Sequence, residues 1–172
     1  MKLAQANLVP VMLEPGIAPA GTGQHDVVWR ILGHTYYLKA ESANAFAFET
    51  FDPPGTFVPP HVHPTQDEFI YVLENGFDLY LDGQHHAAKA GDLVRLPAGI
   101  AHGYYNLSDA PTRAIFWVAP GRRLRELFDT LHDMTDPAQV VAEAAKREVL
   151  FLRPEDAAFD MFALKGKPAP GA

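Results

Sequence analysis

The sequence predicts an all-β sandwich or barrel followed by two α-helices. Turn-forming residues are dense, with 15 prolines and 13 glycines among 172 residues, which excludes a long-helix or coiled-coil protein. Between residues 27 and 118, short alternating apolar runs are interrupted by Pro, Gly, Asn and Asp at the regular spacing of an all-β fold. Beyond Pro120 the apolar residues recur at helical spacing instead.

Seven short runs are predicted as strands because apolar and polar residues alternate in them. They cover residues 27–32, 36–40, 46–51, 69–73, 77–81, 92–96 and 114–118. Two dipeptides, Asn75-Gly76 and Asp82-Gly83, have the composition of type I′ turns. Both therefore predict hairpins that join antiparallel neighbouring strands.

Two helices are predicted after the strands. The apolar face of the first consists of Leu124, Leu127, Phe128 and Leu131. Asp136 can cap the N-terminus of the second, with Pro137 at the first helical position. Residues 149–152 form either a last short strand or an apolar anchor.

A chain of this length buries roughly 70% of the surface that its unfolded form exposes, so one domain can form without disulfides. We expect an N-terminal arm at residues 1–26, the β-barrel at 27–120 and a helical extension at 121–152. A C-terminal tail follows at residues 153–172, and its Lys/Pro/Gly-rich end is expected to be mobile.

Composition excludes several classes of protein. Acidic residues outnumber basic ones by 21 to 14, giving a net charge of −7 and no basic patch for nucleic acid. No stretch approaches the roughly 20 apolar residues of a membrane-spanning helix, and residues 1–13 fit no secretory signal. We therefore expect a cytoplasmic protein without nucleic-acid or membrane partners. Since cysteine is absent, only histidine and carboxylate remain as strong metal ligands.

The first segment with candidate metal ligands surrounds His61 and His63. Alternate residues of an extended chain share a face, so both imidazoles can reach one ion. Pro60 and Pro64 favour the extended backbone on either side. Glu68 begins the next strand, where its carboxylate can face the same cavity.

The second segment contributes His102, at the start of a strand that follows a Pro-Ala-Gly turn. Three imidazoles and one carboxylate would leave two positions open on an octahedral ion. This donor set suits one divalent transition metal per chain, and Fe, Mn, Ni, Co, Cu and Zn all remain candidates. Tyr104 has the same strand parity as His102, so we expect it in the wall of a substrate pocket.

No chemistry is assigned to the other histidines. His85 and His86 follow the Asp82-Gly83 turn and are expected to face solvent. His132 lies on the first predicted helix. Around His25 and His34 the sequence shows no spacing of other candidate ligands or catalytic partners.

The two segments resemble the paired motifs of the cupin superfamily. The matching residues of the first are Gly55, His61, His63 and Glu68. Those of the second are Gly91, Pro97, Gly99, His102 and Asn106. The second matches at every position, whereas seven residues instead of six separate Glu68 from Gly76 in the first. The resemblance implies a single-domain cupin jelly-roll β-barrel (double-stranded β-helix) with two C-terminal α-helices, and His61, His63, Glu68 and His102 as metal ligands.

Residues 46–55 and the two helices after Pro120 are similar to quercetinase-like cupins. That resemblance implies a dioxygenase that cleaves a flavonol or related enolisable aromatic small molecule with O2, with Glu68 taking the substrate's hydroxyl proton. A cupin isomerase, decarboxylase or lyase that uses the metal without O2 is the first alternative. A non-catalytic small-molecule-binding cupin is the second. Cupins commonly pair, so a homodimer that exchanges its N-terminal arms is also expected.

Overall fold

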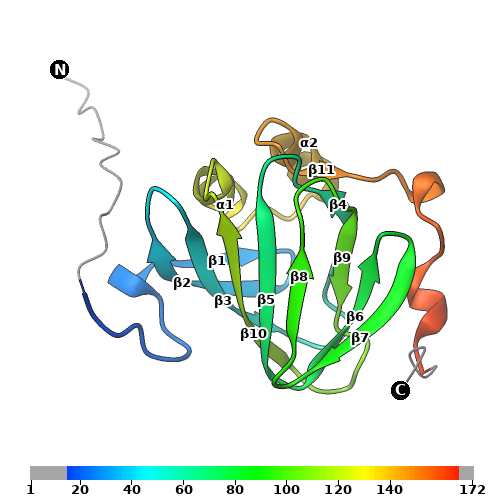
Figure 1. Ribbon diagram of the computed structural model, residues 1–172, viewed down its shortest axis with the longest axis horizontal. Helices are drawn as coiled ribbons and strands as arrows, with labels where there is room; N and C mark the ends of the chain where they lie inside the picture. The colour runs from blue at the N-terminus through cyan, green and yellow to red at the C-terminus, as the bar shows by residue number, and fades with distance from the viewer. Residues whose placement is uncertain (1–14, 167–172) are drawn as a thin grey trace.

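The computed structural model describes residues 15–166 and contains two antiparallel β-sheets (Figure 1). The first sheet has the order β1 (Val28–Ile31), β2 (His34–Glu41), β3 (Phe46–Asp52), β10 (Thr112–Ala119), β5 (Asp67–Glu74) and β8 (Leu93–Leu96). The second has the order β11 (Leu150–Phe151), β4 (Phe57–Val62), β9 (His102–Tyr105), β6 (Gly76–Leu81) and β7 (Gln84–Lys89). Strands distant in sequence are therefore neighbours, as in a jelly roll.

The core lies between the two sheets. In β10 every second residue is buried, which is the alternation expected when one face of a strand is covered. Phe116 of this strand stacks on Phe48 of β3, with ring centroids 5.4 Å apart. It also meets Tyr104 of the opposite sheet at 4.9 Å. Aromatic side chains thus fill the space between the sheets.

One of the two predicted hairpins is confirmed and the other is wrong. Asp82 and Gly83 both have positive φ, and they join β6 to its antiparallel partner β7. The Asn75-Gly76 dipeptide instead connects β5 to β6, which belong to different sheets. Asn75 has a φ of 58°, and its amide donates hydrogen bonds to Ser108 Oγ and Thr112 Oγ1. It therefore stabilises a corner between the sheets.

Both predicted helices are present, as α1 (Leu124–Leu131) and α2 (Pro137–Ala145), and lie at one end of the barrel (Figure 1). The four apolar residues predicted for α1 are buried. Phe128 packs edge-on against Trp29 of β1, with centroids 5.4 Å apart. The side chain of Asp136 accepts a hydrogen bond from the backbone N–H of Ala138, which confirms it as the α2 N-cap. β11 pairs with β4, so residues 149–152 include a short strand.

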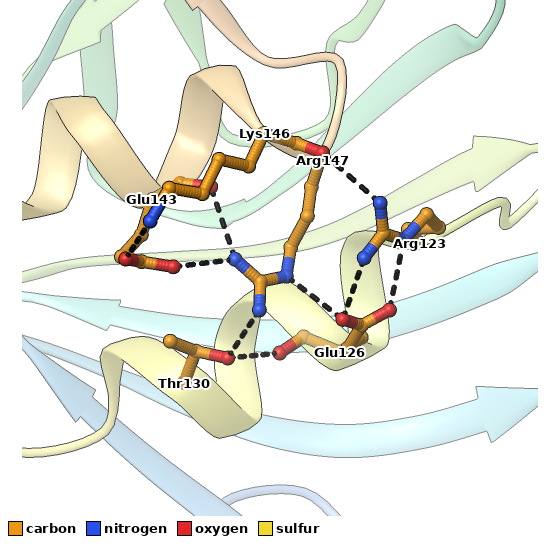
Figure 2. A network of polar contacts seen from close by, with 6 residues as sticks. All are labelled: Arg123, Glu126, Thr130, Glu143, Lys146 and Arg147. Atoms are coloured by element: carbon orange, nitrogen blue, oxygen red, sulfur yellow. Dashed lines mark hydrogen bonds and ion pairs between the residues drawn. The ribbon is translucent and has the colours of Figure 1, made fainter.

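A polar network joins the two helices (Figure 2). Arg147, just beyond α2, donates to Glu126 and Thr130 of α1 at 3.2 and 3.0 Å. It also donates to Glu143 of α2 at 2.8 Å. Arg123, just before α1, binds Glu126 and the backbone carbonyl of Lys146. The two helices are therefore held together as one cover.

The described part of the N-terminal arm lies against its own sheet. Lys39 of β2 binds the carbonyls of Pro19 and Thr22, and the N–H of Gly21 donates to Glu49 of β3. Residues 1–14 lie outside the described part, so arm exchange in a dimer stays a prediction. At the other end, η2 (Pro154–Asp156) and η3 (Met161–Leu164) follow the barrel. Residues 167–172, where mobility is predicted, also lie outside the described range. Within residues 15–166, no helix has the length and apolarity needed to cross a membrane.

Candidate metal centre

Three strands bring the predicted ligands to one point. His61 of β4 is the register partner of His102 of β9, and His63 follows directly after β4. Glu68 enters from β5 of the other sheet. One donor atom from each of the four residues lies within 4.8 Å of the other three. All four side chains are buried, with exposures of 2–5%.

Each histidine is oriented by a hydrogen bond from Nδ1. The acceptors are the backbone carbonyls of Pro59 for His61 and Ile100 for His102, both at 2.9 Å. For His63 the acceptor is Oε1 of Gln66, at 3.1 Å. Because these oxygens only accept, each Nδ1 carries a hydrogen, and in the neutral imidazole Nε2 is then the nitrogen whose lone pair can bind a metal. Such acceptors behind a metal-binding imidazole fix its tautomer and orientation.

This arrangement fits a divalent transition metal. Glu68 Oε2 lies 2.9 Å from His102 Nε2 and 3.3 Å from His63 Nε2. In neutral imidazoles that carry their hydrogen on Nδ1, these atoms are all electron-pair donors, and a cation between them would remove their repulsion. Three nitrogens and one carboxylate oxygen suit Fe, Mn, Co, Ni, Cu or Zn. The described residues thus include a buried group that could hold such a metal.

The electrostatics show that protons compete with a cation for the same atoms. Burial lowers the pKa of His61, and the neighbouring His102 and His63 lower it further. Burial alone would raise the pKa of Glu68, but hydrogen bonds from His102 and His63 hold it well below its ordinary value. Burial likewise opposes protonation of His63, yet Glu68 raises the pKa of that imidazole. Without a metal, a proton shared with Glu68 would balance the carboxylate charge.

A cavity of about 430 Å³ opens beside these residues. Both sheets and both helices line it, and most of the lining is apolar, including Phe48, Phe116, Leu127, Phe128 and Val140. His61, His63 and Glu68 form one polar part of its wall, and Tyr104 also lies in the wall. A volume of this size is typical of small-molecule sites.

A second polar group in the wall was missed by sequence reasoning. His34, which had no partner pattern, is buried, and its Nδ1 lies 2.5 Å from Oδ1 of Asp52. Thr50 donates to the other carboxylate oxygen of Asp52 at 2.5 Å. The β2–β3 register explains this contact. Thr35 pairs with Phe51 in these antiparallel strands, so His34, which precedes Thr35, lies next to Asp52, which follows Phe51.

The expectation that His85 faces solvent is wrong. Its side chain is only 7% exposed, and Nε2 lies 2.7 Å from Oδ1 of Asp78 across the β6–β7 hairpin. The pairing of β6 with β7 brings these two residues close together. The Asp82-Gly83 turn predicts the hairpin but not which side chains meet across it. His86 and His25 are exposed, and His132 accepts a hydrogen bond from the N–H of Arg30.

Two antiparallel sheets around a buried group of three imidazoles and one carboxylate define a jelly-roll barrel with a donor set for a metal. The chain belongs to the cupin superfamily: residues 48–118 match the Cupin_2 family, described as "Cupin domain". A solved RmlC-like cupin from Shewanella frigidimarina has the same fold, with a TM-score of 0.56 and 18% identity over 65% of this chain and 96% of that one.

Three curated relatives differ in their names. Protein SchB of Streptomyces halstedii is 33% identical over 92 residues, which are 52% of this chain and 67% of SchB. Polyketide synthase CurC of Streptomyces cyaneus is 31% identical over 67 residues, or 39% of this chain and 44% of CurC. Quercetin 2,3-dioxygenase of Bacillus subtilis (strain 168) is 31% identical over 85 residues, or 49% of this chain and 25% of that protein. The matches to the last two cover less than half of each relative.

Proposed function

We propose that this chain is a metal-dependent dioxygenase that cleaves a flavonol or a related enolisable aromatic with O2. The observation that carries the proposal is that the donor group of His61, His63, Glu68 and His102 places its first three members in the wall of a largely apolar cavity of about 430 Å³. A flat aromatic can fill such a cavity while its oxygens face the metal ligands. The partial match to a quercetin 2,3-dioxygenase supports the same substrate class.

The chain's own residues have distinct roles in this proposal. A bound metal would supply Lewis-acid stabilisation of an anionic substrate oxygen and redox chemistry with dioxygen. The carboxylate of Glu68 takes the proton of the substrate hydroxyl, since it is buried beside the imidazoles and can face the ionising oxygen. The apolar walls from α1 and α2 orient the rings and exclude water.

A second candidate uses the same ligands without O2. The relative CurC favours it, because CurC carries the name polyketide synthase. Aromatic polyketide skeletons are also flat, apolar and enolisable. In that case Glu68 would move a proton on the substrate during isomerisation, ring closure or loss of a group, and oxygen would not be consumed.

The test combines metal analysis with oxygen uptake. Protein purified without added metal is examined by elemental analysis, and quercetin bleaching is followed in air with an oxygen electrode and under strict anaerobiosis. We expect close to one transition metal per chain, and bleaching that consumes oxygen and stops without it. Bleaching that continues unchanged without oxygen would overturn the dioxygenase in favour of the second candidate.

Two histidine variants control this experiment. The His102→Ala variant should lose both metal and bleaching, because it removes a ligand. The His86→Ala variant should keep both, because His86 is exposed on β7. Full metal content without turnover of quercetin or of any enolisable aromatic would leave a binding protein and contradict both enzymatic candidates.

A further inference from the structure

Two tyrosines from opposite sheets meet in the cavity wall. Tyr36 is on β2 and Tyr104 is on β9, and their hydroxyl oxygens lie 3.1 Å apart. Both residues line the cavity, and both are buried, with exposures of 4% and 6%. The hydroxyl pair is thus a polar site within a mainly apolar wall, and it is made of other residues than the four candidate metal ligands.

The hydroxyl pair has one more donor than it uses. Two phenols carry two protons, and their mutual hydrogen bond takes one of them. Within residues 15–166, neither hydroxyl makes another hydrogen bond. Burial, together with the nearby Asp52, raises the pKa of Tyr36, so the phenol stays protonated. The second proton is therefore available to an acceptor that enters the cavity.

His34 and Asp52 hold the pair in place. The imidazole of His34 stacks on the ring of Tyr36, with centroids 5.6 Å apart and planes 21° apart. It meets the ring of Tyr104 edge-on at 5.8 Å. Its own ring nitrogens lie 2.5 Å from Asp52 Oδ1 and 3.1 Å from the carbonyl oxygen of Phe57. With both nitrogens engaged, His34 is fixed as a positioning residue.

We propose that the Tyr36–Tyr104 pair donates a hydrogen bond to a second substrate oxygen, remote from the oxygen that faces the metal ligands. Tyr104 lies two residues from His102, a separation of roughly 7 Å along a strand. The substrate class that fits is a flat apolar ring system with oxygens at two separated points. The metal-facing half of this inference rests on the proposed function, whereas the tyrosine contact is tested separately.

Binding of matched flavonols tests the contact. The metal-loaded protein is titrated anaerobically, so that no turnover occurs, with 3-hydroxyflavone, 3,7-dihydroxyflavone and 3,4′-dihydroxyflavone, and the flavonol absorbance is followed. All three carry the same chelating oxygens, and two carry one additional remote hydroxyl. We expect one of the dihydroxyflavones to bind at least tenfold more tightly than 3-hydroxyflavone.

Removing both hydroxyls should abolish that preference. The Tyr36→Phe/Tyr104→Phe double variant deletes donor and acceptor together, so no buried hydroxyl loses its partner and folding is expected to persist. In this variant the three affinities should agree within about twofold while metal content is unchanged. Tyr105→Phe is the matched control, because it makes the same chemical change on β9 but in the separate cluster with Leu107 and Met161.

The outcomes separate the two proposals. Equal binding of the three flavonols by the unaltered protein, or an unchanged preference in the double variant, overturns the tyrosine contact and leaves the metal site standing. Binding of none of the three by metal-loaded protein overturns the proposed substrate class, and the tyrosine contact with it.

Discussion

Gln66 accepts the Nδ1 hydrogen of His63 at 3.1 Å and is itself fully enclosed, with an exposure of 2%. Its amide nitrogen donates to the carbonyls of Pro120 and Gly121, each at 2.8 Å. One side chain therefore ties a candidate metal ligand to the segment between β10 and α1. The orientation of the imidazole and the start of the helical cover depend on the same residue.

The Gln66→Leu substitution should weaken metal binding by about 10- to 100-fold without removing a ligand, because loss of such an orienting partner typically has that effect. Metal affinity can be measured by competition with a chromophoric chelator. Gln84→Leu, an exposed glutamine on the β6–β7 hairpin, is the matched control and should leave the affinity unchanged. An unchanged affinity in the Gln66 variant would contradict the orienting role.

Strand positions could be predicted because alternating burial leaves a direct pattern in the sequence, as along β10. Strand partners could not be predicted equally well. Asp82 and Asn75 both adopt positive φ, but one closes a hairpin and the other turns the chain into the second sheet. The difference comes from long-range partners such as Ser108 and Thr112, which hold the Asn75 amide. A local dipeptide carries no information about them.

For the site, alternation and turn placement identified the four residues that the structure brings together. The groups behind His61 and His102 are backbone carbonyls, of Pro59 and Ile100, which any residue would supply. Sequence reasoning therefore had no signal for them. The pairing of His34 with Asp52 depended instead on the β2–β3 register, which an explicit hairpin alignment would have found.

Metal removal should lower thermal stability. A ligand present at 1,000 times its dissociation constant stabilises the folded state by about 4 kcal/mol, which corresponds to roughly 8–16 °C for a chain of this size. We expect a fall of this order in Tm after treatment with a chelator, and recovery when the metal is returned. In His102→Ala the dependence of Tm on metal should disappear, whereas in His86→Ala it should persist. If Tm did not change although the chelator had removed the metal, the result would argue against a stabilising metal at this site.

Glu49 should make stability depend on pH. Burial alone would raise its pKa, but hydrogen bonds from Lys39, Arg113 and the N–H of Gly21 lower it below the ordinary value of 4.5. A carboxyl with a lowered folded pKa contributes stability above its unfolded pKa and loses it as pH falls through the folded value.

The Glu49→Gln variant should therefore lose on the order of 1–2 kcal/mol of unfolding free energy at neutral pH. The difference from the unaltered protein should shrink progressively below about pH 4.5. Urea unfolding across pH 3–8 measures this difference in unfolding free energy. Glu74→Gln is the control, because Glu74 binds the same Arg113 but its side chain is 58% exposed. If the stability difference between the variant and the unaltered protein grew towards acid pH, it would contradict a lowered pKa of Glu49 in the folded state.

The Arg147→Met variant should loosen the cover formed by α1 and α2. The arginine side chain is only 11% exposed and joins Glu126 and Thr130 on α1 to Glu143 on α2 (Figure 2). We expect Tm to fall by about 2–4 °C. The fall should be smaller at high salt, because salt screens the ion pairs of Arg147 with Glu126 and Glu143 in the unaltered protein. Hydrogen exchange should accelerate in α2, and flavonol affinity should fall, because α2 supplies cavity wall although Arg147 does not.

Arg153→Met is the comparison for this last effect. Arg153 binds Asp156 through an ion pair whose side chains are 71% and 47% exposed, and neither residue lines the cavity. Exposed pairs contribute little to stability, so neither Tm nor flavonol affinity should change appreciably. If the Arg147 variant lost stability but kept its flavonol affinity, the network would serve folding alone. A parallel loss of affinity and exchange protection would show that the ion-pair network between the helices shapes the cavity that it does not touch.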